Sequence, residues 1–175
     1  MGAETATEPS PGADLLALYD TALPQVYGYL LTRCGRAALA EDLTAATFLA
    51  AVHATRQDHP VSLSTGWLIT VARNKLVDHW RKQSREERQL TALASEESIE
   101  DPWDTYIDAM RARDVLANLG AHHRAALTLR YVDDLPVAEV AAVLERTLHA
   151  TEALLVRARK AFRAAYTERN RGADA

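Results

Sequence analysis

The sequence predicts an all-α protein made of two small helical domains joined by an acidic linker. Apolar residues recur at steps of three and four along most of the chain, which is the spacing of one face of an α-helix. Glycine and proline account for only 7 and 6 of the 175 residues, and no segment alternates apolar and polar residues as a half-buried strand would. The acidic stretch "EERQLTALASEESIEDPWD" has no long amphipathic period and separates the two helical parts, either as a flexible linker or as a partly helical one.

The first part is expected to contain three helices. The first begins near Leu15, and Pro24 either kinks it or opens a second helix as its first residue. The next runs from about Ala37 to Thr55. The last runs from about Thr65 to Arg85, with Ser64 in the position of an N-cap. The residues expected on their buried stripes are Leu18, Tyr19, Leu23, Val26, Tyr27, Leu30, Leu39, Leu43, Thr47, Ala50, Ala54, Leu68, Val71, Ala72, Leu76 and His79.

The second part is expected to contain three more helices, over about 121–131, 136–144 and 149–166. Only "ERTL" separates the last two, as in a helix-turn-helix. Their expected inner stripes are Val137, Val140, Ala141 and Leu144, and then Thr151, Leu155, Ala158, Phe162 and Ala165.

Charge is distributed unevenly along a chain whose net charge is −4. Residues 84–108 carry −6 and residues 109–175 carry +3. The stretch "ARNKLVDHWRKQSR" places five basic side chains and Trp80 around a single acid, Asp78. Because binding responds to the local field, the acidic total does not exclude a polyanionic partner. A solvated helix face is the simpler interpretation of this stretch alone.

Several classes of protein are excluded or disfavoured by composition. Cys34 is the only cysteine, which rules out an internal disulfide and a zinc site built on several cysteines, and fits the cytoplasm. We expect no membrane insertion and no secretion signal. We also expect no enzymatic activity, cofactor or metal, because there is no phosphate-binding glycine loop, no nucleophile elbow and no metal-ligand spacing among the histidines. The histidines are His53, His59, His79, His122, His123 and His149.

Three groups of residues are candidates for binding. The basic end of the last helix, with Arg157, Arg159, Lys160 and Arg163, could contact phosphates while the helix lies in a DNA major groove. The pair Glu41-Asp42 beside an apolar stripe suits docking on a basic protein surface. Trp67 and Trp80 lie among cations that could follow single-stranded nucleic acid. Each group also has an ordinary structural interpretation: a helical hairpin with a basic end, a soluble helix face, and core indoles, the last favoured for Trp67.

The order of these segments is more specific than any one of them. "AEDLTAATFLAAV", then "GWLITVARNKLVDHWRKQSR", then the acidic linker, then "LRYVDDLPVAEVAAVLERTLHATEALLVRARKAF" resembles the extracytoplasmic-function sigma factors of bacterial RNA polymerase. The resemblance covers roughly residues 14–166. It implies an N-terminal tail (1–13), sigma region 2 (14–84), an acidic linker (85–108), sigma region 4 (109–168) and a C-terminal tail (169–175).

The resemblance also implies a set of functional residues. Core polymerase would bind Glu41, Asp42, Leu43, Thr47 and Phe48. The minus-ten promoter element would be opened and held by Asn74, Lys75, Asp78, His79, Trp80, Arg81 and Lys82, with Trp80 either packing or stacking. The minus-thirty-five element would be read by His149, Thr151, Glu152, Arg157, Arg159 and Lys160. The implied partners are core RNA polymerase, promoter DNA and an anti-sigma factor that holds the free protein inactive.

Two departures from the family pattern concern the second part. Glu145 stands in the turn where the family usually has glycine, and the recognition helix starts without an arginine or lysine before Arg157. Glu152 could accept a hydrogen bond from cytosine N4, and Thr151 could touch a thymine methyl group or a phosphate. Two other functions are considered: a stand-alone helix-turn-helix regulator, which leaves "AEDLT" unexplained, and a sigma-like protein-interaction module.

Overall fold

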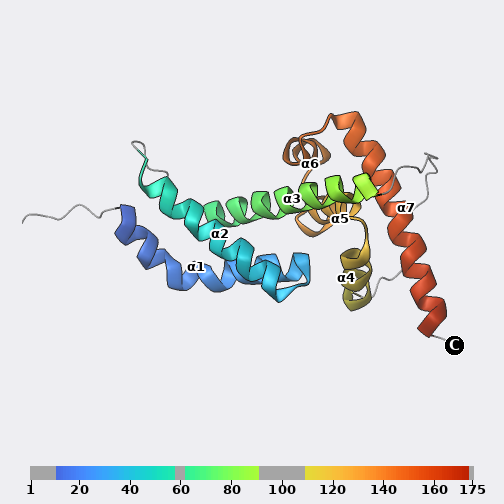
Figure 1. Ribbon diagram of the computed structural model, residues 1–175, viewed down its shortest axis with the longest axis horizontal. Helices are drawn as coiled ribbons and strands as arrows, with labels where there is room; N and C mark the ends of the chain where they lie inside the picture. Colours follow the sequence, from blue (N-terminus) through green and yellow to red (C-terminus); the bar gives the residue numbers. More distant parts are fainter. Residues whose placement is uncertain (1–10, 58–61, 91–108, 174–175) are drawn as a thin grey trace, which may run out of the picture. The chain divides into compact units, whose positions relative to one another are not determined.

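The computed structural model describes residues 11–57, 62–90 and 109–173, and all the regular secondary structure in these ranges is helical (Figure 1). The expected all-α fold is therefore confirmed. The chain forms two compact units, Met1–Leu76 and Val77–Ala175, so the division falls inside one helix, α3. Among the described helices none is long and apolar enough to cross a membrane.

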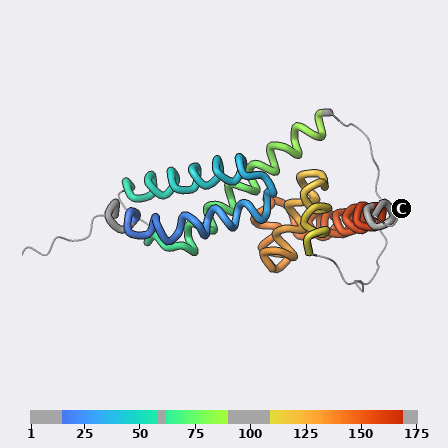
Figure 2. The backbone as a smooth tube through the Cα atoms, turned by 90° about the horizontal axis from the view of Figure 1, so that it is seen from below, coloured from blue at the N-terminus to red at the C-terminus, as the bar shows by residue number. Residues whose placement is uncertain are grey.

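The first unit contains α1 (Pro11–Cys34), α2 (Ala37–Thr55) and the first half of α3 (Thr65–Leu90). Helices α1 and α2 lie side by side along their length (Figure 2). Pro24 neither ends α1 nor opens a new helix, because α1 continues through it. The turn to α2 is tight because Gly35 has a φ of 67° and its amide donates to the carbonyl of Leu31 at 2.9 Å.

The core of the first unit comes from the predicted stripes. Val26, Leu30, Leu68 and Ala72 are completely buried. Ser64 caps α3 as expected, since its hydroxyl oxygen accepts a hydrogen bond from the amide of Trp67 at 3.1 Å. Other members of the expected stripes are less buried: Val71 and His79 are only half-buried, and Tyr19 is exposed.

The second unit joins the rest of α3 to α4 (Ala109–Asn118), α5 (Ala121–Leu127), a π-helical turn (Thr128–Val132), α6 (Val137–Leu144) and α7 (Leu148–Ala173). In the π-turn the amide of Asp133 donates to the carbonyl of Thr128 at 2.9 Å. One core cluster combines α4, α5 and α7 and consists of Val115, Leu127, Ala158, Phe162 and Tyr166.

Several boundaries differ from the expected ones. Helix α4 was not anticipated, α3 continues to Leu90 into the segment expected as linker, and α7 extends beyond Tyr166 to Ala173. Residues 91–108 of the expected linker and residues 1–10 of the expected tail (1–13) lie outside the described residues, whereas residues 11–13 of that tail belong to α1. The "ERTL" break between α6 and α7 is a tight turn, as predicted.

That turn is built by two local devices. Glu145 takes the left-handed conformation (φ 52°, ψ 48°), and the amide of Arg146 donates back to the carbonyl of Ala141 at 2.9 Å, which closes the C-terminus of α6. The hydroxyl oxygen of Thr147 accepts from the amide of Ala150 at 3.2 Å, which caps the N-terminus of α7.

Candidate functional site

The acidic face of α2 combines two exposed carboxylates with an apolar groove. Glu41 and Asp42 point to solvent, and a groove of about 470 Å³ lies beside Glu41 between α1 and α2. Tyr19 and Phe48 meet at its wall with ring centroids 5.0 Å apart in an edge-to-face arrangement. The residues that line the groove are Tyr19, Leu23, Pro24, Tyr27, Glu41, Thr44, Ala45 and Phe48. The face therefore suits a partner that offers both cations and apolar side chains.

Three of the five residues expected to touch polymerase are buried in the first unit. Thr47 is 0% exposed and its hydroxyl donates to the carbonyl of Leu43 at 2.7 Å, so it has no free group to offer. Leu43 and Phe48 are also buried, although Phe48 reaches the groove wall. The α1 residues of the groove were not anticipated as contacts. The helical period places Tyr19 on the inner stripe, so the sequence did not predict that this side chain is exposed.

The candidate minus-ten residues on α3 fall into exposed and covered groups. Asn74, Asp78 and Lys82 are exposed, and Lys75 and His79 are half-buried. Lys75 also lines a second groove, of about 440 Å³, together with Trp67, Val71 and residues of α2.

Trp80 belongs to the core of the second unit. Its side chain is 1% exposed, and the guanidinium of Arg124 lies 5.6 Å from its ring centroid. Arg124 is itself buried and donates to the carbonyl of Ala117 at 2.9 Å and to the side-chain oxygen of Gln83 at 3.0 Å. Of the two roles open to Trp80, this structure shows packing and leaves no face of the indole for a base to stack on.

Arg81 is occupied by three partners. It forms ion pairs with Asp78 at 3.0 Å and with Glu145 at 3.1 Å, and it donates to the main-chain carbonyl of Val143. Its side chain is 24% exposed. A contact between Arg81 and DNA therefore requires that the bonds to the α6–α7 turn first be broken.

The candidate minus-thirty-five residues on α7 also divide. His149, Glu152 and Lys160 are exposed and lie three, eight and eleven positions apart, which places them on one face of the helix. Thr151 is 0% exposed and its hydroxyl donates to the carbonyl of Thr147, so its expected base contact does not fit this structure. Arg157 and Arg159 are half-buried, and the pKa of His123 is lowered first by burial and then by the nearby Arg157.

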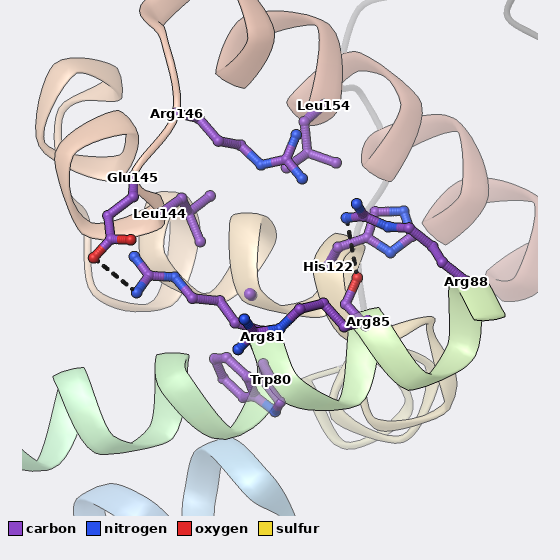
Figure 3. A pocket seen from close by; sticks show the side chains of 11 residues that line it. Trp80, Arg81, Arg85, Arg88, His122, Leu144, Glu145, Arg146 and Leu154 are labelled. Atoms are coloured by element: carbon purple, nitrogen blue, oxygen red, sulfur yellow. Dashed lines mark hydrogen bonds and ion pairs between the residues drawn. The ribbon is translucent and has the colours of Figure 1, made fainter.

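A pocket in the second unit gathers arginines that the sequence did not bring together. Its volume is about 270 Å³ (Figure 3). Its lining comes from α3, α5, the α6–α7 turn and α7, and consists of Trp80, Arg81, Ser84, Arg85, Arg88, His122, Ala125, Leu144, Glu145, Arg146 and Leu154. We call it the arginine pocket. The spacing of Arg81, Arg85 and Arg88 along α3 signals a common face, but nothing local predicts that His122 and Arg146 join them.

The arginine pocket is strongly electropositive. The pKa of His122 is lowered to about 4, first by burial and then by the nearby His123, Arg88, Arg146 and Arg157. Burial, followed by repulsion from Arg88 and Arg157, also lowers the pKa of Arg146. At neutral pH His122 is therefore uncharged, and the arginines supply the positive charge.

Comparison with known proteins identifies the two parts of the chain. The family model for Sigma-70 region 2 matches residues 18–86, and the model for Sigma-70, region 4 matches residues 109–162. Together they cover more than half of the chain.

Curated relatives and a solved structure agree with these matches. The chain is 34% identical to the ECF RNA polymerase sigma factor BldN of Streptomyces coelicolor over 81% of this chain, but it spans only 56% of BldN's length. It is 29% identical to SigM of Bacillus subtilis, covering 90% of this chain and 96% of SigM. With SigL of Mycobacterium tuberculosis it shares 31% identity over 71% of this chain and 73% of SigL.

The fold is similar to that of the sigma factor RpoE from Bartonella quintana, solved in complex with the anti-sigma factor NepR. The TM-score is 0.52 at 21% identity, covering 88% of this chain and 97% of RpoE. The helical fold, the helix-turn-helix, the two family matches and the curated relatives lead to one conclusion: the chain belongs to the extracytoplasmic-function sigma factors of bacterial RNA polymerase.

Proposed function

We propose that this protein binds core RNA polymerase and directs it to specific promoters, which it recognises and helps to open. The observation that carries the proposal is the presence of sigma region 2 and sigma region 4 on one helical chain. Members of this family are generally regulators of transcription and not enzymes. Because core polymerase works on the chromosome, the cytoplasm is the compartment in which the protein would act.

Core polymerase would dock on the acidic face of α2. Glu41 and Asp42 supply the charge, and the apolar groove beside them supplies area that can be removed from water. Leu43 and Thr47 would act indirectly, because they are buried and hold α2 in place. Tyr19 packs edge-to-face against Phe48, and both rings line the groove. Tyr19 therefore joins the proposed contact residues.

The minus-ten element would be met by the exposed polar face of α3. Asn74, Asp78 and Lys82 are accessible, and Lys75 and His79 are partly so. A base taken out of the stack costs a few kcal/mol, which backbone cations and a receiving pocket must offset. Arg81 would add its charge once it leaves Glu145, while Trp80 supports α3 from within the core.

The minus-thirty-five element would lie against α7. His149 and Glu152 can reach base edges from the exposed face, and Lys160 can contact the phosphate backbone farther along the helix. Arg159 is half-buried and could add a phosphate contact, whereas Thr151 secures the start of α7 through Thr147.

An anti-sigma factor is proposed as the regulator of the free protein, as the family resemblance implies. The RpoE relative of similar fold was solved with such a partner, NepR. A pull-down from the native cell that recovers no inhibitor, combined with full activity of the free protein, would count against this part of the proposal.

Run-off transcription tests the function directly. Bacterial core polymerase, this protein and a library of promoter fragments should yield specific initiation and reveal both promoter elements. Core binding without transcription from any fragment would favour the interaction-module alternative. Duplex DNA binding without core binding would favour the stand-alone regulator, which leaves the acidic face of α2 unexplained.

A further inference from the structure

The arginine pocket has cations on two opposite walls. Arg81, Arg85 and Arg88 come from α3, and Arg146 comes from the α6–α7 turn; Figure 3 shows Arg81 and Arg146 approaching the same space from these two sides. The remaining wall is largely apolar, with Ala125, Leu144 and Leu154 next to the buried indole of Trp80. All these residues belong to the second compact unit.

The positive charge in the arginine pocket is only partly balanced. Among the described residues Glu145 is the one carboxylate in the lining, and it already pairs with Arg81 at 3.1 Å. Arg88 donates to the hydroxyl of Ser84 at 3.3 Å, which carries no charge. Within the described part of the chain, no carboxylate forms an ion pair with Arg85, Arg88 or Arg146. Like charges are therefore held together at a cost that a bound anion would lower.

Two buried nitrogen atoms of the pocket residues lack a hydrogen-bond partner. Among the described residues, Arg81 Nε and His122 Nδ1 are inaccessible to solvent and unbonded. Buried polar atoms in folded proteins are nearly always satisfied, so these two nitrogens are exceptions among the lining residues. The pKa of His122 is lowered first by burial and then by His123, Arg88, Arg146 and Arg157, which places these three arginines near the imidazole.

We infer that the arginine pocket binds a small molecule that carries a diphosphate group. Guanidinium groups bind phosphate oxygens in a planar, bidentate geometry, and two adjacent phosphates match several arginines better than a single carboxylate does. The volume of about 270 Å³ lies just below the range of pockets for drug-sized ligands, which fits a diphosphate with little else enclosed. The inference goes beyond the proposed function, since binding requires neither polymerase nor promoter.

The shape of the pocket favours a small molecule over nucleic acid. Its arginines come from two facing walls, α3 on one side and the α6–α7 turn on the other, so they can contact a compact anion from two sides. A DNA backbone presents successive phosphates along a line and is followed by cations on an open surface. The exposed Lys82 and Lys160, which lie outside the lining, have that open character.

Isothermal titration of the full chain with inorganic pyrophosphate tests the inference. We expect saturable binding at one site, weakened about tenfold or more by Arg146→Gln, since tenfold corresponds to the loss of one charge-assisted hydrogen bond. Glu145→Gln removes the carboxylate that lines the pocket in the described part of the chain and should strengthen binding severalfold. This opposite sign cannot result from partial unfolding. Arg113→Gln makes the same charge change at an exposed position of α4 and should have no effect.

Three results would overturn the inference. Equal binding by wild type, Arg146→Gln and Arg113→Gln would show a diffuse electrostatic effect. No saturation by pyrophosphate at about 1 mM, an affinity that corresponds to about −4 kcal/mol, would show no site. Binding of a single-stranded oligonucleotide that depends on Arg146, with no pyrophosphate binding, would assign these arginines to nucleic acid instead. A nucleoside diphosphate that binds more tightly than pyrophosphate would support the inference and identify the source of the phosphates.

Discussion

Glu145 holds a backbone conformation that normally belongs to glycine, and its side chain offers a reason. At φ 52° and ψ 48° a residue with a Cβ is strained by roughly 1 kcal/mol. Its carboxylate forms the ion pair with Arg81, but it is 77% exposed, so that pair contributes little to stability. Glutamate in place of the family's usual glycine therefore puts a carboxylate beside Arg81 at a small cost in stability.

Two substitutions of Glu145 distinguish the effect of its backbone strain from the effect of its charge. Glu145→Gln removes the carboxylate and keeps the strain, whereas Glu145→Gly removes both. In urea unfolding we expect Glu145→Gly to be more stable than Glu145→Gln by up to about 1 kcal/mol. The gain is reduced by the greater conformational entropy that glycine gives to the unfolded chain. Glu139→Gly, at an exposed position within α6, should instead destabilise by about 1 kcal/mol. A glycine variant that is less stable than the glutamine variant would show that position 145 is not strained.

His122 should make stability depend on pH. Its pKa is about 4 in the folded protein and 6.5 in the unfolded chain, so below pH 6.5 the unfolded state takes up a proton that the folded state does not. Stability is thus fully present above pH 6.5 and falls as the pH drops towards 4. The loss should be on the order of 2 kcal/mol after allowance for solvent screening.

Unfolding at pH 7, 5.5 and 4.5 measures this dependence. His122→Gln should flatten it, leaving a residual slope from His123, whose pKa is lowered by burial and by Arg157. His53→Gln, on an exposed part of α2, is the matched control and should keep the wild-type slope. An unchanged slope in His122→Gln would assign the acid sensitivity to other groups.

At the scale of the elements, α2 has an exposed acidic face, which is the proposed contact surface, and a buried face that packs in the core of the first unit. Reversing two exposed charges with Glu41→Lys and Asp42→Lys should abolish binding to core polymerase, because a basic partner surface would then be repelled. Glu139→Lys combined with Glu168→Lys makes the same change in net charge at exposed positions of α6 and α7 and should leave the affinity intact. Fluorescence anisotropy of labelled protein with core enzyme measures both. Equal affinity of the two double variants would remove α2 from the interface.

Helix α3 should contribute its cations in two steps. Lys82 is exposed and can meet the DNA backbone at once, whereas Arg81 must first leave Glu145 and the carbonyl of Val143. Lys82→Gln should lower the salt dependence of promoter opening by about one unit of slope, and adding Arg81→Gln should lower it by up to about two. Arg111→Gln with Arg113→Gln on α4 is the control. A slope that none of these changes alters would reject the assignment.

Helical periodicity predicted most elements because each buries a long stripe. Helix α4 was not anticipated because it is only ten residues long: Ala112, Val115 and Leu116 follow the helical period and pack on the core of the second unit, but Val115 alone is fully buried. Thr47 and Thr151 show a conflict that the pattern itself contained. Both fell on inner stripes, yet the family resemblance listed them as contacts, and the structure buries them with their hydroxyls bonded to the preceding turn. In this structure the inner-stripe pattern therefore describes these two threonines better than their position in the family motif does.

At the scale of the whole molecule, the arginine pocket shows what sequence patterns cannot supply. Arg88, His122 and Arg146 are separated by tens of residues and belong to three different elements. Only packing within the second unit brings them together, and packing is not periodic. The family resemblance did not help either, because it describes residues that face partners and is silent about those that face one another.

The two parts of the molecule should perform separable tasks. Glu152 on α7 can accept a hydrogen bond from cytosine, so Glu152→Ala should relax discrimination at one base pair of the minus-thirty-five element by about 1–3 kcal/mol. Core affinity should not change, because the acidic face of α2 is untouched. Transcription from a library randomised in that element, together with a core-binding assay, measures both quantities.

Thr151→Ser is the matched control for that experiment. It alters the neighbouring residue but keeps the hydroxyl that bonds to Thr147, so it should cost some stability and leave promoter choice unchanged. If Thr151→Ser shifts promoter preference while Glu152→Ala does not, α7 must present a different face to DNA. If Glu152→Ala lowers core affinity instead, promoter reading and polymerase binding are not separable in this chain.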